Sequence, residues 1–241
     1  MQSQTPFQKV LPKKMSDFIL EQLEEAIILK EFLSEEQLPT ERDLAAMFNA
    51  SRLAVREALS QLEQNGLIEK RLGAKGGTFV LPLTENSHRR TREEIRKGWN
   101  EMQEVFEFRS VIEPEAAFLA AVRCSKHDLL MLREYVEKSM EADCSREVFR
   151  ALDVRFHLLI ARASNNIYLE KAVRQIRTKI NPALDLMPYN TQIKLASYDK
   201  HLELIDALSS RDGSRAKDLM RQHIDATSAA IYARVVTGQH E

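Results

Sequence analysis

Four side chains suited to metal binding fall on three predicted helices in the second half of the chain. Asp153 and His157 stand one helical turn apart in ALDVRFHLLI, residues 151–160, beside the apolar stripe of that helix. The same periodicity turns His201 and His223 inward from two later helices. A buried carboxylate without a partner is costly. Asp153 therefore needs a basic side chain, a metal ion or water beside it.

One carboxylate and three imidazoles form a set of oxygen and nitrogen ligands that suits Zn, Ni, Mn or Fe. A single buried histidine is usually an ordinary core residue. Four such residues converging from three helices favour a metal site, because helical bundles build such sites between facing helices. Periodicity alone leaves both interpretations open.

Arg109 is a further polar residue on an apolar helix face, in MQEVFEFRSVIEPEAAFLAA. Arginine is seldom buried without a partner. Glu113, one turn later, could pair with it. Alternatively, the guanidinium could bind the carboxylate of a small ligand through two parallel hydrogen bonds.

The elements that must position these residues are helices from residue 101 onward. Hydrophobic periodicity predicts them near 101–123, 126–142, 145–163, 167–187, 191–210 and 213–236. Pro182 should kink the fourth of these helices. Because no strand-like alternation occurs there, residues 101–236 are predicted to form an all-α bundle of six or seven helices with room for a cavity.

Residues 10–81 predict a different fold, in which three helices precede a β-hairpin. We expect helices over 15–33, from Glu41 onward, and from the N-cap Ser51 to the stop at Gly66. LIEKRLGAKGGTFVL then predicts two short strands around a glycine-rich turn. This order is typical of a winged helix-turn-helix domain, whose second paired helix can enter the major groove of DNA. The predicted fold class is mainly α, with residues 82–100 linking the two domains.

Local charge agrees with a DNA-binding face, although the formal net charge of the whole chain is only −1. Residues 1–50 carry five basic and nine acidic residues, whereas residues 51–77 carry five basic and three acidic ones. The basic residues of this second segment include Arg52, Arg56 and Lys75. Arg52 and Arg56 share a helix face, from which they could contact guanine or phosphate. A solvated surface pair is the alternative.

Composition limits the other classes. The longest apolar runs, such as AAFLAAV at 116–122, are too short to span a membrane, and the first residues lack the apolar region of a secretory signal. Cys124 and Cys144 form no CxxC pair or disulfide framework and are expected to be small packing residues. These features favour a reduced, cytoplasmic compartment.

The segments LPTERDLA, SRLAVREAL, GLIEKR and GGTFV follow one another over residues 38–80. In order and spacing this stretch resembles the DNA-binding domain of GntR-family bacterial transcription regulators. The resemblance implies that operator DNA is contacted by several residues of the helix pair and the wing. We expect these to be Thr40, Arg42, Ser51, Arg52, Arg56 and Gly76, with Lys75 beside Gly76 at the wing tip.

Residues 101–232 resemble the FCD ligand-binding domain of the FadR subfamily. DVRFH is similar to its D-x-x-x-H motif, and His201 and His223 fall at its two later ligand positions. The resemblance implies one divalent transition-metal ion per chain, held by Asp153, His157, His201 and His223, with Zn favoured over Ni, Mn or Fe. FRSVIE resembles the R-x-x-x-E stretch of the first FCD helix, which implies that Arg109 binds an organic-acid or sugar-acid effector.

These observations predict a homodimeric transcription regulator, a repressor rather than an enzyme, that a small carboxylate releases from double-stranded operator DNA. A homodimer is expected because a two-fold operator needs two winged helices. One alternative is a metal-dependent hydrolase with a DNA-binding appendage, since three histidines and an aspartate could activate water. The other is a metal-sensing repressor. The absence of a further inward general base disfavours the hydrolase, and Arg109 favours an organic acid over a bare ion as the signal.

Overall fold

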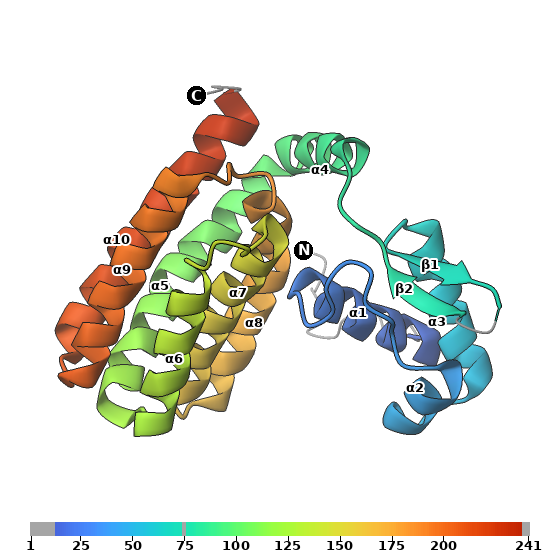
Figure 1. Cartoon of the computed structure of the whole chain (residues 1–241), viewed down its shortest axis with the longest axis horizontal. Helices are drawn as coiled ribbons and strands as arrows, with labels where there is room; N and C mark the ends of the chain where they lie inside the picture. Colours follow the sequence, from blue (N-terminus) through green and yellow to red (C-terminus); the bar gives the residue numbers. More distant parts are fainter. Residues whose placement is uncertain (1–12, 74–75, 238–241) are drawn as a thin grey trace, which may run out of the picture. The chain divides into compact units, whose positions relative to one another are not determined.

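The structure is a computed structural model, and it describes residues 13–73 and 76–237. The chain divides into two compact units. The winged-helix unit comprises Met1–Ile27 and Ser34–Pro82, and the helical unit comprises Ile28–Leu33 and Leu83–Glu241. Figure 1 shows the first as helices beside a hairpin and the second as a bundle of long helices lying side by side.

The winged-helix unit contains α1 (Met15–Ile28), α2 (Glu41–Met47) and α3 (Arg52–Gln64), followed by β1 (Ile68–Arg71) and β2 (Gly77–Val80). The two strands are antiparallel, with Ile68 opposite Val80 and Arg71 opposite Gly77. All five elements contribute to a buried apolar core, made of Ile19, Leu23, Leu44, Val55, Leu59, Leu62, Ile68 and Val80. The predicted winged helix-turn-helix fold is therefore confirmed.

Helix caps in this unit lie where the sequence places them. The side chain of Thr40 accepts a hydrogen bond from the amide of Asp43 at the start of α2. Ser51 accepts one from the amide of Ala54 at the start of α3. Gly66, just beyond α3, has a φ of 72°, a backbone conformation that glycine adopts without strain.

The predicted helix over 15–33 is too long, because α1 ends at Ile28. Two residues later Lys30 has a φ of 57°, which breaks the helical course. Its buried ammonium lies 2.9 Å from a carboxylate oxygen of Asp185, and both residues belong to the helical unit. A distant ion pair thus accompanies the early end of the helix, and local periodicity does not reveal such a pair.

The helical unit contains seven α-helices among the described residues, which confirms the predicted all-α bundle. They are α4 (Glu85–Lys97), α5 (Trp99–Arg123), α6 (Lys126–Lys138), α7 (Arg146–Ala163), α8 (Ile167–Leu184), α9 (Thr191–Ser209) and α10 (Gly213–Tyr232). A short π-helix, Ala233–Thr237, follows. Most of the predicted linker over 82–100 is occupied by α4. Pro182 lies in the last turn of α8, which ends two residues later instead of continuing to 187.

The bundle is organised around α5, which packs against α7, α8, α9 and α10. Alanines at 116, 117, 120 and 121 are fully buried on α5, and these small side chains let neighbouring helices approach closely. Cys124 and Cys144 are buried free thiols, and burial raises the pKa of both. Within residues 13–73 and 76–237, no helix has the length and apolar character needed to cross a membrane.

Candidate metal centre and nucleic-acid interface

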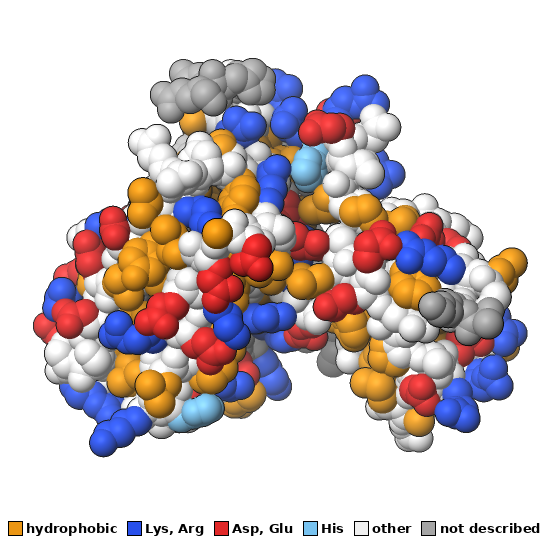
Figure 2. All heavy atoms as spheres, viewed as in Figure 1, with side chains coloured by type: hydrophobic (Ala, Val, Ile, Leu, Met, Phe, Trp, Pro, Cys, Tyr) orange, Lys and Arg blue, Asp and Glu red, His pale blue; other side chains and the backbone are white. Residues whose placement is uncertain are grey.

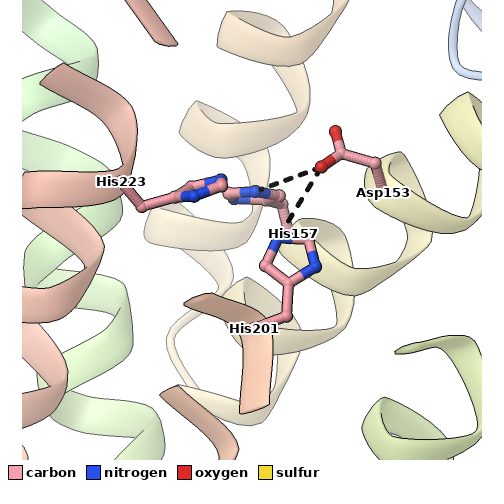
Figure 3. A group of neighbouring side chains, drawn as sticks. All are labelled: Asp153, His157, His201 and His223. Atoms are coloured by element: carbon pink, nitrogen blue, oxygen red, sulfur yellow. Dashed lines mark ion pairs between the residues drawn. The ribbon is translucent and has the colours of Figure 1, made fainter. Parts of the chain in front are cut away.

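Asp153, His157, His201 and His223 converge inside the helical unit. Each offers one ligand atom, and these four atoms all lie within 4.8 Å of one another. Figure 3 shows the three imidazole rings and the carboxylate turned toward one another from α7, α9 and α10. The structure thus brings together all four residues that the sequence singles out as metal ligands.

The donor atoms of this cluster fit a divalent transition-metal ion. Oδ1 of Asp153 lies 3.8 Å from Nε2 of His157 and 3.7 Å from Nε2 of His201. Both Nε2 atoms are buried and have no hydrogen-bond partner among the described residues. Unpartnered buried nitrogens are rare, and a cation that accepts their lone pairs would satisfy them.

Glu113 on α5 fixes the orientation of His157. Nδ1 of His157 lies 2.6 Å from Oε2 of Glu113, and both side chains are buried. A carboxylate only accepts hydrogen bonds, so Nδ1 carries the proton and Nε2 keeps a free lone pair that faces the cluster. Sequence reasoning paired Glu113 only with Arg109 and missed this contact.

Arg109 takes part in the same chain of contacts. Its Nε donates to Oε1 of Glu113 at 2.7 Å, so the internal ion pair considered from the sequence is present. The side chain is 1% exposed, yet its Nη1 has no partner among the described residues. Part of the guanidinium therefore remains available to a ligand.

Asp153 has a basic partner that the sequence analysis did not identify. Nη2 of Arg177, on α8, donates to Oδ2 of Asp153 at 2.5 Å. Arg177 is fully buried and stands beside the buried Val173 and Ile176. The sequence feature that could have revealed Arg177 is an arginine on the apolar face of a predicted helix. Arg150 could have been found in a similar way, because it precedes Asp153 by one helical turn on the same face of α7.

The protonation states agree with a preformed ligand set. Burial by itself would raise the pKa of Asp153, but Arg177 and the imidazoles outweigh burial and hold that pKa well below its usual value. Burial lowers the pKa of His201 to about 3, against the pull of Asp153. Burial and the neighbouring imidazoles hold the pKa of His223 well below its usual value. The carboxylate is ionised and these two imidazoles are neutral at neutral pH, as metal ligation requires.

The cluster borders a cavity of about 490 Å³ within the helical unit. Arg109, Asp153 and His223 line it, together with two further arginines, Arg150 and Arg177. Apolar side chains supply most of the remaining wall, among them Phe149, Leu184, Met187 and Ile193. A volume of this size accommodates a small organic molecule.

In the winged-helix unit, the residues expected at DNA lie on the exposed side of α2 and α3. Arg42, Arg52 and Arg56 are all exposed, and Figure 2 shows Lys and Arg side chains gathered along this edge of the unit. Arg56 is held by Glu41, with Nε and Nη2 lying 3.3 and 3.0 Å from the two carboxylate oxygens. Thr40 and Ser51 are the helix caps described above.

The wing tip also requires glycine. A Cβ atom at Gly76 would lie 2.5 Å from the carbonyl oxygen of Arg71 and 2.8 Å from that of Gly73, so no larger residue fits this backbone. Arg71 lies over the ring of Phe79, with its guanidinium carbon 4.4 Å from the ring centroid. Lys75, which we also expected at DNA, lies outside the described residues.

Comparison with known families agrees with both units. Residues 15–80 match the bacterial regulatory proteins of the gntR family, and residues 104–226 match the FCD domain. The chain belongs to the GntR family of bacterial regulatory proteins and carries an FCD domain, a combination consistent with the FadR subfamily. It is a DNA-binding transcription regulator with an effector-binding domain.

Curated relatives align along most of the chain. A putative HTH-type transcriptional regulator RmpR of Mycobacterium gastri is 29% identical, over 93% of this chain and 84% of the relative. A putative L-lactate dehydrogenase operon regulatory protein of Escherichia coli K12 is 28% identical, over 89% and 85%. The HTH-type transcriptional repressor NanR of Salmonella newport is 27% identical, over 92% and 86%.

Solved structures show the same fold. E. coli McbR/YncC aligns with a TM-score of 0.57 and 18% identity, covering 92% of this chain and 99% of the other. A putative GntR transcriptional regulator from Rhodococcus sp. RHA1 aligns with a TM-score of 0.51 and 20% identity, covering 94% and 99%.

Proposed function

We propose that this protein is a repressor whose affinity for operator DNA falls when a small carboxylic acid binds in the cavity of the helical unit. The observation that carries the proposal is that Arg109 and the cluster residues Asp153 and His223 border one cavity. A buried guanidinium with an unpartnered Nη1 can donate to a carboxylate oxygen of the effector.

The metal of this proposal is one divalent ion per chain, held by Asp153, His157, His201 and His223, with Zn preferred. Three imidazoles and one carboxylate suit Zn, and Ni, Mn and Fe accept the same ligands. When bound, the ion would supply positive charge and a coordination position for an anionic oxygen of the effector. Glu113 orients His157 for this role, and Arg109 holds the acid beside the cluster.

We propose that Thr40, Arg42, Ser51, Arg52, Arg56, Lys75 and Gly76 contact the operator. The exposed arginines of α2 and α3 support this, because guanidinium groups bind phosphates and guanine edges. The relative NanR is named a repressor, which supports repression over activation.

A homodimer is part of the proposal. Phe108, Val111 and Val122 of α5 are about half exposed, at 46%, 58% and 54%. Their spacing along α5 places Phe108 and Val111 on one face together with Val122. Exposed apolar side chains gathered on one helix face favour burial against a second copy, and two copies would present two winged helices to a two-fold operator.

A metal-sensing repressor is the second candidate, because the buried ligand cluster could by itself make DNA affinity depend on an ion. The cavity and the unpartnered Nη1 of Arg109 favour an organic acid as the signal. The test is fluorescence anisotropy of a labelled operator that the protein itself has selected from random DNA. Release by an acid only with metal present supports our proposal. Release or retention governed by the ion alone, whatever acid is added, supports metal sensing.

A further inference from the structure

The cavity of the helical unit is lined by three buried arginines, Arg109, Arg150 and Arg177, which are 1%, 8% and 0% exposed. Moving a guanidinium out of water is costly unless an anion or a full set of acceptors replaces the water. The three arginines differ in which groups replace the water around their guanidinium nitrogens.

Two of these arginines have a carboxylate partner. Nε of Arg109 donates to Glu113 at 2.7 Å, and Nη2 of Arg177 donates to Asp153 at 2.5 Å. Asp153 is also a member of the ligand cluster, so Arg177 shares its carboxylate with the imidazoles. Nε of Arg177 is buried and has no partner within residues 13–73 and 76–237.

Arg150 has no carboxylate partner within the described part of the chain. Its Nη2 reaches only the carbonyl oxygens of Met187 and Pro188, at 3.5 and 3.4 Å, which are long for hydrogen bonds. Its guanidinium carbon lies 5.4 Å from the ring centroid of Phe149. Nε of Arg150 is buried with no partner in the same described ranges. The side chain is thus a buried cation beside a cavity that could hold its anion.

Arg150 and Arg177 act on the same region of the cavity. Burial is the main cause that lowers the pKa of Arg150, and the nearby positive charge of Arg177 adds to it. Asp153 and Asp185 oppose this shift, but Asp153 is already bound by Arg177, and Asp185 is bound by Lys30 at 2.9 Å. The two unpartnered Nε atoms belong to these neighbouring guanidinium groups.

Arg177 contacts the ligand cluster directly at Asp153, whereas Arg109 contacts it through Glu113, which bonds His157. Arg150, Asp153 and His157 follow one another along one face of α7, and seven residues of helix rise about 10 Å. Glu113 holds Arg109 beside His157, at the far end of that distance from Arg150. A ligand in the cavity can therefore meet one guanidinium at each end.

We propose that Arg150 and Arg177 form a second anion-binding subsite, so that the effector is a small dianion with one acidic group at each end. This inference rests on the proposed function, in which Arg109 and the metal cluster bind the first carboxylate. The second acidic group is a carboxylate or a phosphate, since both accept hydrogen bonds from paired guanidinium groups. A phosphate carries about −1.5 to −2 near pH 7, so the dianion of this proposal includes acids whose phosphate takes the total charge beyond −2.

Charge balance supports a dianion over a monocarboxylate. Three buried guanidinium groups face the two carboxylates that pair with two of them, Glu113 and Asp153, which leaves an excess of one positive charge among these five side chains. Elsewhere on the cavity wall, Lys200 pairs with Glu203 at 3.1 Å, and Asp199 is exposed to solvent, which screens its charge. A divalent metal raises this excess to three. A monocarboxylate would leave most of it uncompensated beside buried guanidinium groups, whereas a dianion neutralises the larger part.

The test is isothermal titration calorimetry of the full-length, zinc-loaded protein with acids matched in carbon skeleton. Butyrate is compared with succinate, 2-hydroxybutyrate with malate, and glycerate with 3-phosphoglycerate, so that the carboxylate and phosphate arms are separate. We expect the tightest-binding dianion to bind at least about tenfold more tightly than its matched monoanion. Charge-assisted hydrogen bonds from one guanidinium to the second acidic group account for a gain of that size. Arg150→Met should reduce that ratio to near one without weakening monoanion binding.

Two control variants keep the result interpretable. Arg155→Met removes an exposed arginine from the same helix and should keep the wild-type ratio. Arg150→Lys keeps the charge but loses the planar fork and should give an intermediate ratio. Arg150→Met should melt no lower than wild type without ligand, because it removes an unpartnered buried charge.

The outcomes separate this inference from the function on which it rests. The subsite is wrong if no dianion is preferred, if no acid binds, or if Arg150→Met weakens both members of a pair equally. When monoanions alone bind and release the operator, the proposed function stands without the subsite. When dianions bind through Arg150 but leave operator affinity unchanged, the subsite stands and the effector role fails.

Discussion

Nδ1 of His157 and Oε2 of Glu113 lie 2.6 Å apart inside the bundle, although 44 positions separate the two residues in the chain. The contact joins α5 to α7 and sets which imidazole nitrogen faces the ligand cluster. Because the other oxygen of Glu113 accepts from Arg109, one buried carboxylate links the residue proposed for the effector to a residue proposed for the metal. Glu113 therefore connects the two halves of the site.

We predict that Glu113→Gln lowers zinc affinity by about tenfold or more, in the range seen when a hydrogen-bond partner of a metal-binding histidine is lost. Competition with a chromophoric chelator measures this affinity. Glu107→Gln, which changes an exposed glutamate on the same helix, is the matched control and should bind zinc like wild type. Equal zinc affinities for both variants would show that Glu113 serves only Arg109.

Replacing His201 and His223 together by alanine should abolish binding of the ion. Without metal, loss of two imidazoles from the cluster should change the melting temperature little beyond the effect of the cavity created. With zinc present, the wild type should gain stability that the double variant does not, because a ligand that binds only the folded state stabilises it. Elemental analysis before and after EDTA, with melting curves under both conditions, checks this. A zinc-dependent shift that survives in the double variant would place the ion elsewhere.

The depressed pKa of His201 predicts how metal-free protein responds to acid. Its imidazole titrates near 6.5 when unfolded and at about 3 when folded. Between these values the unfolded chain binds a proton that the folded chain does not, so stability is lost as the pH falls below 6.5. The melting temperature in EDTA should therefore decline from about pH 7 to about pH 5, and less steeply in His201→Gln. His127→Gln, at an exposed histidine, should follow the wild-type curve. Parallel curves for all three proteins would contradict burial of a neutral His201.

The sequence carries enough information for the existence of the helices and for the inward faces of the four proposed ligands, because both depend on local spacing. Ser51 and Gly66 mark the two ends of α3 through their own backbone preferences. Asp153 and His157 share a helix face by periodicity alone. The histidines of α9 and α10 are identified by the same rule, combined with the resemblance to the FCD family.

The charged partners around these proposed ligands could not be predicted from the sequence, because they depend on which helices pack together. Arg177 reaches Asp153 from α8 across 24 positions, and Glu113 reaches His157 across 44. No spacing rule within one helix predicts such pairs. The early end of α1 is accompanied by a contact of the same kind, since Lys30 pairs with Asp185 from far along the chain. Buried arginines on apolar faces were visible in the sequence, but their partners were not.

On the winged-helix unit, Arg52→Ala and Arg56→Ala should each weaken specific operator binding by roughly ten- to hundredfold, as expected when a contact to a base or phosphate is lost. Both side chains are exposed, so folding should be nearly unaffected. Arg133→Ala, at an exposed arginine of α6, is the control for general loss of positive charge. Anisotropy titrations at two salt concentrations measure the affinity. Unchanged operator affinity in Arg52→Ala/Arg56→Ala would show that this face of α3 does not contact the operator.

The last prediction separates the two roles of Arg109. If its Nη1 binds the effector, Arg109→Met should stay on the operator at acid concentrations that release the wild type, and act as a super-repressor. A ligand shifts a two-state equilibrium only by the difference between its affinities for the two states. Weaker binding of the acid therefore uncouples effector sensing from DNA binding. The single variant also leaves Glu113 buried without its guanidinium, which destabilises the bundle. The informative comparison is therefore between Glu113→Gln and Arg109→Met/Glu113→Gln, since neither carries an ionised residue at position 113. With zinc saturating, Glu113→Gln should still release the operator when the acid is added, and the double variant should not. Release of both at the same acid concentration would show that Arg109 only supports Glu113 and that the acid binds through other residues.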